Sequence, residues 1–335
     1  MIGYYAHHVG LGHVQRASFV ARRLDTPVTL LSCRVPPDMG AFADFVELAR
    51  DDDLPWIGDP TAKGALHWVP LHHPGLRTRM AQITRWVELA KPTLMVVDVS
   101  VEVGALSRLL GVPVVTFTMP GDRDDAAHTL SYTIAELIIA AWPRDLYDPA
   151  WLRPYARKTA FVGAFSRFDD AVDRLGPAAP HDRDAPQVLV LNGVGGSMVD
   201  EATYGSTTCA LPQFCWHSAG VGPTDWRNDM AAELRTADVV VTHGGQNAVA
   251  EVATFRVPAV VIPQARPHGE QVATAGALAR AGLATVLQAW PATDLWPHIL
   301  ATALARGGDR WTRWAPPGAA QKAADAIKTV VDRFR

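Results

Sequence analysis

Residues 237–251 read ADVVVTHGGQNAVAE, and this stretch decides the fold class. The β-branched run at 238–242 predicts a buried strand, and the apolar spacing from 246 onward predicts a helix. The run VPAVVIP at 257–263 predicts the next strand, and HGEQ at 268–271 stands at the following helix start. Strand, turn and helix in this order are typical of a parallel sheet, whose carboxyl edge binds ligands in open α/β folds. A His-Gly-Gly turn at that edge offers open N–H groups and an imidazole to a diphosphate.

The same alternation extends along the whole chain. We predict strands near 2–6, 27–33, 93–97, 112–117, 158–162, 187–191, 212–217, 238–242, 257–262 and 284–287. Helices are predicted between them, near 13–24, 77–90, 101–110, 126–141, 227–236, 246–254, 269–281 and 293–306. Short buried strands that alternate with helices predict an α/β fold of two doubly wound, Rossmann-like parallel-sheet domains with a cleft between them.

A break in this alternation marks the expected boundary between the domains. Residues 164–185 carry several charges, the segment GPAAP and no apolar period, which is typical of an exposed linker. We therefore expect an N-terminal, acceptor-binding domain over 1–165, a linker over 166–185 and a C-terminal domain over 186–315. Residues 316–335 predict a helix that packs either back on the N-terminal domain or on its own domain.

The composition excludes several classes of protein. The 335 residues are 48% hydrophobic and 19% charged, which excludes wholesale disorder. A formal net charge of -3 argues against a protein that wraps nucleic acid, because such binding needs a basic face. Three cysteines without paired spacing indicate neither a disulfide framework nor a structural zinc site. The sequence begins without a leader-like segment and has no membrane-spanning run, so we expect a cytoplasmic protein.

Two further motifs follow predicted strands. QVLVLNGVGGS at 187–197 places glycines where backbone N–H groups could approach a phosphate, although a tight turn without a ligand explains them about as often. HHVGLGHVQR at 7–16 joins the first strand to the first helix, and LMVVD at 94–98 ends a strand at Asp98. Taken alone, His13 also fits a helix cap or a surface group, and Asp98 also fits the cap of the helix near 101.

These segments together resemble the nucleotide-sugar glycosyltransferases of the GT-B fold, especially the branch with the peptidoglycan N-acetylglucosaminyltransferase and the UDP-glycosyltransferases. The resemblance covers 188–287 clearly and 4–121 more weakly. It implies a donor site in the C-terminal domain, where position 248 is alanine instead of the phosphate-binding hydroxyl of many relatives. The nucleotide and its phosphates would contact Gly195, Gly196, Ser197, Trp226, Arg227, His243, Gly244, Gly245, Asn247 and Glu251, and the donor sugar would contact Glu270 and Gln271.

The resemblance also implies an acceptor site in the N-terminal domain. His13 would be the general base, a role suited to an imidazole, and Asp98 would orient it. The acceptor would lie near Gly10, Gly12, His7 and His8. Adjacent histidines point apart in an extended chain, and no carboxylate stands at ligand spacing, so we expect no metal and no other cofactor.

The function that follows is inverting, metal-independent transfer of a sugar (a hexosyltransferase type of reaction) from a nucleoside-diphosphate sugar, most simply a UDP-sugar. The acceptor is left open among a small molecule, a glycan and a lipid-linked group. We expect the protein to bind no nucleic acid and to make at most peripheral contact with the inner face of the membrane. Alternatives on the same scaffold are a nucleotide-sugar hydrolase and a non-hydrolysing 2-epimerase, since fold alone does not choose the reaction. A non-catalytic, nucleotide-sugar-binding partner subunit is the alternative from another class.

Overall fold

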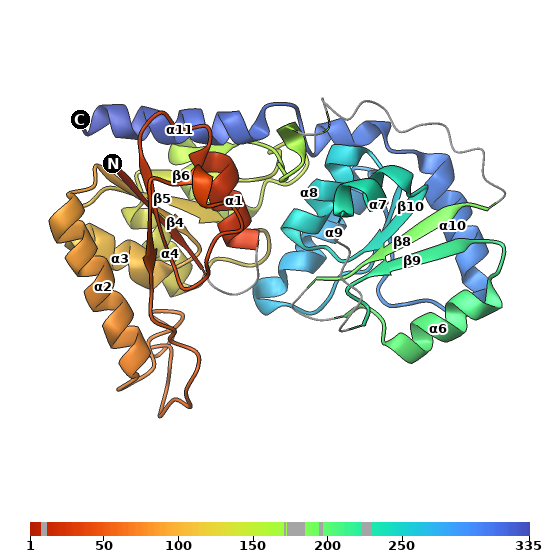
Figure 1. Ribbon diagram of the computed structural model, residues 1–335, viewed down its shortest axis with the longest axis horizontal. Coiled ribbons are helices and arrows are strands. Elements are labelled where there is room, and N and C mark those ends of the chain that lie inside the picture. The colour runs from red at the N-terminus through yellow and green to blue at the C-terminus, as the bar shows by residue number, and fades with distance from the viewer. Residues whose placement is uncertain (8–11, 171, 173–184, 194–196, 223–228) are drawn as a thin grey trace. The chain divides into compact units, whose positions relative to one another are not determined.

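The computed structural model describes residues 1–335 apart from 8–11, 171, 173–184, 194–196 and 223–228. The chain forms two compact units (Figure 1). The first consists of Met1–Ala141, Asp148–Val162 and Gly318–Arg335, and the second of Trp142–Tyr147 and Gly163–Pro317. Each unit is built on one parallel sheet, as the alternating pattern predicts.

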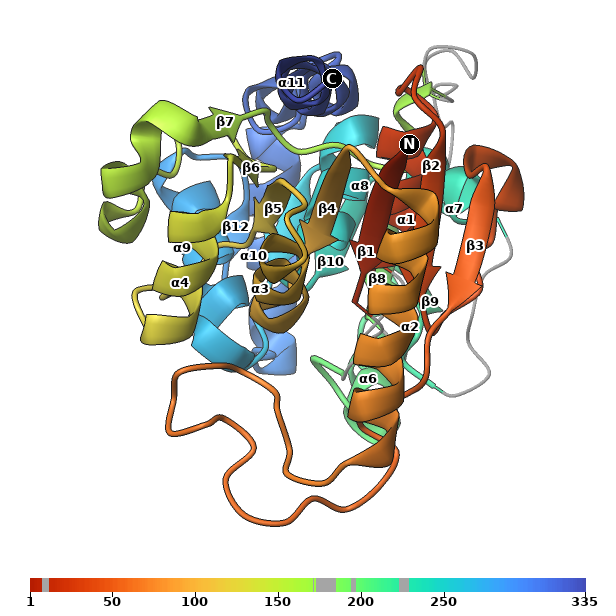
Figure 2. The same cartoon turned by 90° about the vertical axis from the view of Figure 1, so that its left-hand side faces the viewer.

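The sheet of the first unit has seven parallel strands in the order β3-β2-β1-β4-β5-β6-β7 (Figure 2). The strands are β1 (Ile2–Ala6), β2 (Val28–Ser32), β3 (Asp44–Glu47), β4 (Leu94–Asp98), β5 (Val114–Thr118), β6 (Leu137–Ala140) and β7 (Thr159–Phe161). The order reverses between β1 and β4, so the crevice outside their carboxyl ends is where this topology binds ligands. In register, Ala6 at the end of β1 pairs with Asp98 at the end of β4.

Helices cover both faces of this sheet. On one face lie α2 (Pro74–Ala90), α3 (Val101–Leu109) and α4 (Ala126–Ile134), and on the other lie α1 (Gly12–Ala21) and α11 (Ala319–Arg333) (Figure 2). Short 3-10 turns are η1 (Met39–Ala41) and η2 (Ala150–Lys158). A core of buried side chains, including Leu31, Ile83 and Val97, fills the space between α2, α3 and the sheet.

Two parts of the first sheet differ from the sequence prediction. The helix predicted over 126–141 is wrong in its second half, because α4 ends at Ile134 and residues Leu137–Ala140 form β6. The run Leu-Ile-Ile-Ala is buried on both faces as an inner strand, a pattern that short apolar runs share with buried helices. The sequence also did not predict β3, whose four residues are half-exposed at an edge of the sheet and carry no continuous apolar run.

The sheet of the second unit has five parallel strands in the order β12-β11-β10-β8-β9. They are β8 (Gln187–Leu191), β9 (Cys215–Ala219), β10 (Val239–Thr242), β11 (Ala259–Val261) and β12 (Thr285–Val286). The helices are α6 (Glu201–Ala210), which was not predicted, α7 (Met230–Thr236), α8 (Gln246–Phe255), α9 (Glu270–Arg280) and α10 (Trp296–Arg306), with 3-10 turns η3 (Pro267–Gly269), η4 (Thr293–Leu295) and η5 (Asp309–Arg313). This order reverses between β8 and β10, which again marks the ligand-binding crevice.

The segment predicted as the start of a linker packs on the second unit. Ser166 bonds Thr254 of α8 at 2.9 Å between their hydroxyl oxygens, and Asp169 accepts from Thr254 at 3.0 Å. The compact second unit therefore begins at Gly163 instead of 186, while most of 166–185 lies outside the described residues.

Helix α11 follows the second unit in sequence and belongs to the first in space (Figure 1). It contacts α1 and β6 with a buried face that includes Ile327, Val330 and Val331. Lys328 also pairs with Asp25 at 2.7 Å. In the described part of the chain, no helix is long and apolar enough to cross a membrane.

Candidate active site

The first unit brings His13 and Asp98 together at the reversal point of its sheet. His13 lies in the first turn of α1, and Asp98 ends β4 with its side chain completely buried. The imidazole Nδ1 is 2.9 Å from Oδ1 of the carboxylate. The two residues that the resemblance pairs are thus in hydrogen-bond contact, and the geometry suits a carboxylate that orients an imidazole.

A third residue, Arg16, completes this cluster and was not among the candidates. Its Nε lies 2.8 Å from Oδ2 of Asp98 and its Nη2 lies 2.9 Å from Oδ1. Burial alone would raise the pKa of Asp98, but the charges of Arg16 and His13 outweigh it and hold that pKa at about 2. The signal in the sequence is the spacing of Arg16 from His13, since residues three apart share a helix face.

The chain turns sharply directly after Asp98. Val99 has a φ of 64°, a left-handed conformation that is a true outlier for a β-branched residue. Such strain persists where the surroundings enforce it, often at functional sites. Ser100 then caps α3 by accepting from the N–H of Val103 at 3.2 Å, so the reading of Asp98 as the helix cap is wrong.

A pocket in the first unit lies beside this cluster. Its lining residues are His67, Val99, Ser100, Val101, Thr116, Phe117, Thr118, Met119, Arg123, His128, Ser131 and Tyr132. Phe117 lies under the Arg16 guanidinium at 5.2 Å, and the Met119 sulfur is 3.6 Å from Arg16 Nη2. Phe117 and Met119 therefore line the pocket and also contact Arg16, so the pocket lies next to the residue that binds Asp98.

One wall of the pocket is a chain of polar contacts with defined proton positions. Arg123 can only donate, so Nε2 of His128 accepts from it at 2.9 Å. Nδ1 of His128 therefore carries the proton and donates to Asp125 at 2.5 Å, while His67 lies 3.2 Å from the other carboxylate oxygen. Burial lowers the pKa of His128 to about 4, against the opposing pull of Asp125, so this imidazole is neutral at pH 7.

His67, Asp125 and His128 are also close enough in space to act as ligands of a metal ion. Two imidazoles and a carboxylate are ligand types that zinc accepts. The proton on Nδ1 of His128 and the neighbouring Arg123 guanidinium oppose a cation at this place. The described contacts therefore favour a hydrogen-bonded wall, and the absence of a metal requirement stays a prediction.

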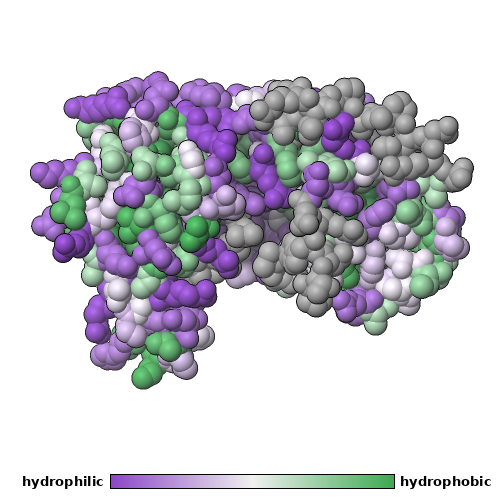
Figure 3. Space-filling view, viewed as in Figure 1, coloured by the Kyte–Doolittle hydropathy of each residue, from purple (hydrophilic) through white to green (hydrophobic). Residues whose placement is uncertain are grey.

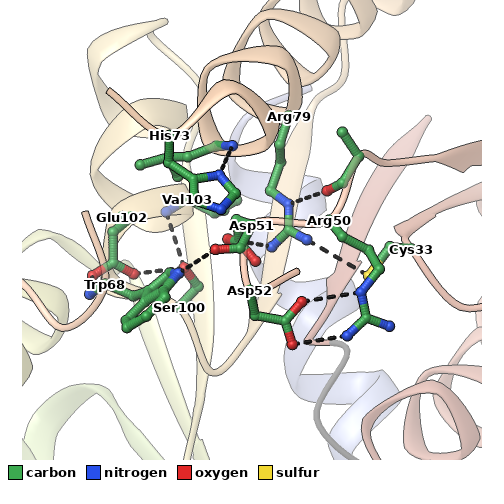
Figure 4. Close-up of polar contacts among 12 residues, drawn as sticks. Cys33, Arg50, Asp51, Asp52, Trp68, His73, Arg79, Ser100, Glu102 and Val103 are labelled. Atoms are coloured by element: carbon green, nitrogen blue, oxygen red, sulfur yellow. Dashed lines mark hydrogen bonds and ion pairs between the residues drawn. The ribbon is translucent and has the colours of Figure 1, made fainter. Parts of the chain in front are cut away.

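The loop that carries His67 is anchored to helices α3 and α2, and Figure 4 shows Glu102 beside Trp68 and Arg79 beside Asp51. Glu102 of α3 accepts from the backbone N–H groups of His67 and Trp68 at 2.7 and 3.0 Å. At the start of the loop, Arg79 of α2 pairs with Asp51 at 2.7 Å, and both side chains are buried. The buried pair and the Glu102 contacts fix both ends of residues 51–68 to the helices that flank the sheet.

The outer part of the same loop exposes apolar side chains, visible at the lower end of the first unit in Figure 3. Trp56 is 53% exposed and Ile57 is 72% exposed, although the Trp56 ring also packs edge-on against Trp68. Large exposed apolar groups in one place often mark a contact surface. The outer part of the loop therefore presents apolar side chains to solvent.

In the second unit, His243 is the centre of the candidate donor site. It follows β10 directly and is buried. A Cβ on Gly193, after β8, would lie 2.7 Å from its Nε2, and a Cβ on Gly245 would clash with its Cε1. A Cβ on Gly244 would lie 2.5 Å from the backbone oxygen of Gln271 at the start of α9. Glycine is thus required for three loops to meet at this edge of the sheet.

The protonation of His243 follows from its contacts. Its Nδ1 accepts from the N–H of Gly245 at 3.0 Å, so Nε2 carries the proton. Burial, with a smaller effect of the nearby Arg266 charge, lowers its pKa to about 4. His243 is therefore a neutral hydrogen-bond donor at the start of α8, and Arg266, which the sequence analysis did not single out, adds positive charge to the same site.

Glu251 lies on α8 and is paired with an arginine. Its Oε1 is 2.9 Å from Nε of Arg167, whose Nη2 lies 3.4 Å from Oε2. Burial raises the pKa of Glu251, although Arg167 opposes this effect. The alternative reading of Glu251 as a solvated helix residue is wrong, because its side chain is only 9% exposed.

The other candidate residues fall into three groups. Gln271 is buried and its Oε1 accepts from the N–H of Gln264 at 2.9 Å, so its amide holds the loop before α9. Asn247 and Glu270 lie in the first turns of α8 and α9. The Ser197 hydroxyl accepts a hydrogen bond from the side-chain amide of Asn192 at 2.8 Å. Gly12 is the first residue of α1, and His7 directly follows β1. The candidates outside the described residues are His8, Gly10, Gly195, Gly196, Trp226 and Arg227.

Comparison with known proteins finds similarity to glycosyltransferases. Residues 201–330 match the glycosyltransferase family 28 C-terminal domain. The chain is 30% identical over 216 residues to the UDP-N-acetylglucosamine–N-acetylmuramyl-(pentapeptide) pyrophosphoryl-undecaprenol N-acetylglucosamine transferase of Pectobacterium carotovorum subsp. carotovorum (strain PC1), covering 55% of this chain and 58% of that protein. The protein of the same name from Oceanobacillus iheyensis is 27% identical over 228 residues, with 60% and 61% covered. The matches thus span about 60% of the relatives' length.

Solved structures match over almost the whole chain. The glycotransferase of kitacinnamycin has a TM-score of 0.69 at 19% identity, with 98% of both chains covered. MurG of Acinetobacter baumannii has a TM-score of 0.66 at 18% identity, covering 98% of this chain and 99% of that one. The calicheamicin glycosyltransferase CalG4 scores 0.65 at 20% identity, with 99% and 98% covered. These likenesses establish the fold.

The two parallel-sheet units thus form a GT-B glycosyltransferase fold. Within that class, the chain resembles MurG and the UDP-glycosyltransferases, and residues 201–330 are similar to the family 28 C-terminal domain. The predicted fold class of two Rossmann-like parallel-sheet domains is confirmed.

Proposed function

We propose that the protein transfers a sugar from a UDP-sugar to a hydroxyl-bearing acceptor, with inversion at the anomeric carbon. The observation that carries this proposal is the His243 turn, where a neutral imidazole N–H, two glycines and a helix start meet at the reversal point of a sheet. That combination suits a diphosphate leaving group. The relatives named as UDP-N-acetylglucosamine-dependent transferases support the choice of a uridine nucleotide.

The donor site we infer has three parts. The diphosphate lies against His243, Gly244, Gly245 and the first turn of α8, and Arg266 adds a favourable charge. The ribose hydroxyls donate to Glu251, which they share with Arg167. Glu270 at the start of α9 faces the donor sugar, while Gln271 acts through the loop that its side chain holds. No metal takes part in this arrangement, because the N–H donors stabilise the leaving diphosphate.

In the first unit, His13 removes the proton from the acceptor hydroxyl through Nε2. The acceptor oxygen forms the new bond to the anomeric carbon, the bond from that carbon to the diphosphate oxygen breaks, and UDP leaves with its electron pair. The acceptor hydroxyl lies beside Nε2 of His13, and the small pocket lined by Val99, Arg123, His128 and Tyr132 lies near it. The exposed apolar side chains of Trp56 and Ile57 in the same unit suit contact with an acceptor that has an apolar part.

The reaction class is tested by nucleotide release. A transferase releases UDP from a UDP-sugar at full rate only when an acceptor is present, and mass spectrometry of the mixture identifies the glycosylated product. Full release without acceptor would identify a hydrolase. Conversion of UDP-N-acetylglucosamine to UDP-N-acetylmannosamine, with UDP released and then added back, would identify a 2-epimerase. Binding of the UDP-sugar without release under any condition would favour a non-catalytic partner subunit.

We expect Gly193→Ala to weaken UDP binding about 10-fold, or about 1.4 kcal/mol. The new Cβ would stand 2.7 Å from Nε2 of His243 and displace the imidazole from the phosphate position. Calorimetric titration with UDP measures the change. The matched control is Gly205→Ala on α6, where a Cβ meets nothing within 4 Å. It should leave the affinity unchanged and raise stability by ~0.5–1 kcal/mol. Equal UDP affinity in both variants would contradict the phosphate site.

Glu251→Ala is expected to weaken UDP binding by ~1–3 kcal/mol, because it removes charge-assisted bonds to the ribose. The control is Asp294→Ala, an exposed carboxylate of the same unit. Arg167→Ala separates the two roles of Glu251. If the carboxylate serves only to pair with Arg167, both variants lower stability alike and neither changes the UDP affinity, which would remove Glu251 from the donor site.

A further inference from the structure

Arg16 holds both oxygens of the Asp98 carboxylate in a two-pronged contact. The Nε–Oδ2 and Nη2–Oδ1 distances are 2.8 and 2.9 Å, and the arginine is only 4% exposed. The Tyr4 hydroxyl donates to Oδ2 from 3.3 Å. Phe117 and Met119 contact the guanidinium from the side of the pocket. A planar guanidinium held on so many sides fixes the plane of the carboxylate that it binds.

The same contacts decide which nitrogen of His13 carries the proton. Nδ1 lies 2.9 Å from Oδ1 of Asp98 and 3.2 Å from Nη2 of Arg16. An unprotonated Nδ1 would set its lone pair against a carboxylate oxygen at hydrogen-bond distance, which is repulsive. Nδ1 therefore carries the proton and donates it to Asp98, while the Arg16 N–H points to the carboxylate. This leaves the lone pair on Nε2.

Arg16 also balances the charge of the buried Asp98. The guanidinium lies against both carboxylate oxygens, and its Nη2 stands 3.2 Å from Nδ1 of His13. The described titratable and charged groups around the His13 ring are Asp98 from β4, Arg16 from α1, Tyr4 from β1, and His7, whose ring lies 6.0 Å away.

We propose that Arg16 is a positioning residue of the transfer reaction, which fixes the plane of the Asp98 carboxylate and through it holds the His13 ring with its proton on Nδ1 and its lone pair on Nε2. The proposal rests on the proposed function, in which Nε2 of His13 takes the acceptor proton. Arg16 itself touches neither the donor nor the acceptor. It acts by holding the carboxylate that orients the base.

The test compares Arg16→Met with Arg16→Lys. We expect kcat for transfer at pH 7 to fall ~10-fold to 100-fold in Arg16→Met, since misplacement of a reacting group by about 1 Å costs about that much. The KM for the UDP-sugar should not change. Arg16→Lys keeps the positive charge but not the planar guanidinium, so it should restore little of the lost kcat, because lysine cannot fix the plane of the carboxylate.

An arginine that contributes only charge or packing would give a different pattern. Arg16→Lys would then restore kcat, or Arg16→Met would lower kcat only in proportion to the fraction of unfolded protein. Either result would overturn the proposal. The control is Arg22→Met, an exposed arginine just after α1 that pairs with Asp38, and it should leave kcat unchanged.

A second measurement needs neither activity nor a variant of Arg16. Selective ¹⁵N labelling of histidine, with His13→Gln to assign the signal, reports which ring nitrogen carries the proton. We expect the Nδ1–H tautomer in the wild-type protein at neutral pH, and an Nε2–H tautomer would overturn the proposal even if Arg16→Met failed to fold. UDP titration is independent of this signal. Failure of UDP binding would refute the proposed function, whereas an Nε2–H ring with normal UDP binding would refute only the role of Arg16.

Discussion

His13→Ala is expected to keep the fold and the UDP affinity while transfer falls by ~10²–10⁴-fold, the usual contribution of a positioned general base. The effect should be large because, in the proposed reaction, Nε2 of His13 is the only atom that accepts the proton of the acceptor hydroxyl. Transfer is measured as acceptor-dependent UDP release, and binding is measured by calorimetry with UDP. A weakly nucleophilic alcohol should show the full loss. An amine acceptor, which is partly neutral already, should show less.

The control is His298→Ala, an exposed histidine on α10 that should leave transfer unchanged. Asp98→Asn should lower transfer less than His13→Ala, and the two losses should be strongly non-additive, because Asp98 acts through His13. Normal transfer by His13→Ala would contradict the assignment of the base and direct attention to His7. Additive losses would instead show that Asp98 works independently of His13.

Arg79→Leu is expected to lower the free energy of unfolding of the first unit by ~3–5 kcal/mol, as removal of one partner of a buried ion pair usually does. Arg79 donates to Asp51 at 2.7 Å (Figure 4), and it also donates to the carbonyl of Ala49 at 2.8 Å and to the Tyr5 hydroxyl at 3.2 Å. Its loss would leave a buried carboxylate without its main counter-charge. Urea denaturation followed by tryptophan fluorescence measures the change.

Arg50→Ala is the matched control, since its pair with Asp52 lies next to the buried pair but on the surface (Figure 4). Exposed pairs of this kind contribute ~0.2–1 kcal/mol, so its effect should be small. Arg79→Leu with Asp51→Leu should recover part of the lost stability, because no buried charge is then left alone. A loss below about 1 kcal/mol for Arg79→Leu would show that water compensates Asp51, and the loop would not depend on this anchor.

The fold could be predicted from the sequence where the local apolar pattern of a segment matches its place in the sheet. Short apolar runs between helical periods predicted most strands of both sheets, because inner parallel strands are buried on both faces. The same property explains the failure at Leu137–Ala140, since a short, wholly apolar run carries no period that separates a strand from a buried helix. The edge strand β3 failed for the opposite reason, as its half-exposed residues lack an apolar run.

The candidate sites show a similar division. Residues that directly follow strands were found because the carboxyl ends of parallel strands meet at one edge, and this placed His243 near Gly193 and His13 near Asp98. The arginines that pair with the candidate carboxylates were not found. Arg16 and Arg167 reach Asp98 and Glu251 over 82 and 84 residues of sequence, and such pairings depend on the packed structure and not on local pattern.

The position of α11 has a consequence for the order in which the protein can fold during synthesis. The ribosome makes the sheet of the first unit early, but the helix that covers one face of it emerges only after the entire second unit. Until then, the side of α1 that meets α11 stays open to water and to other nascent chains. The second unit, by contrast, is continuous apart from Trp142–Tyr147 and can close as soon as it leaves the ribosome. The half of the chain that is translated first therefore reaches its final form last.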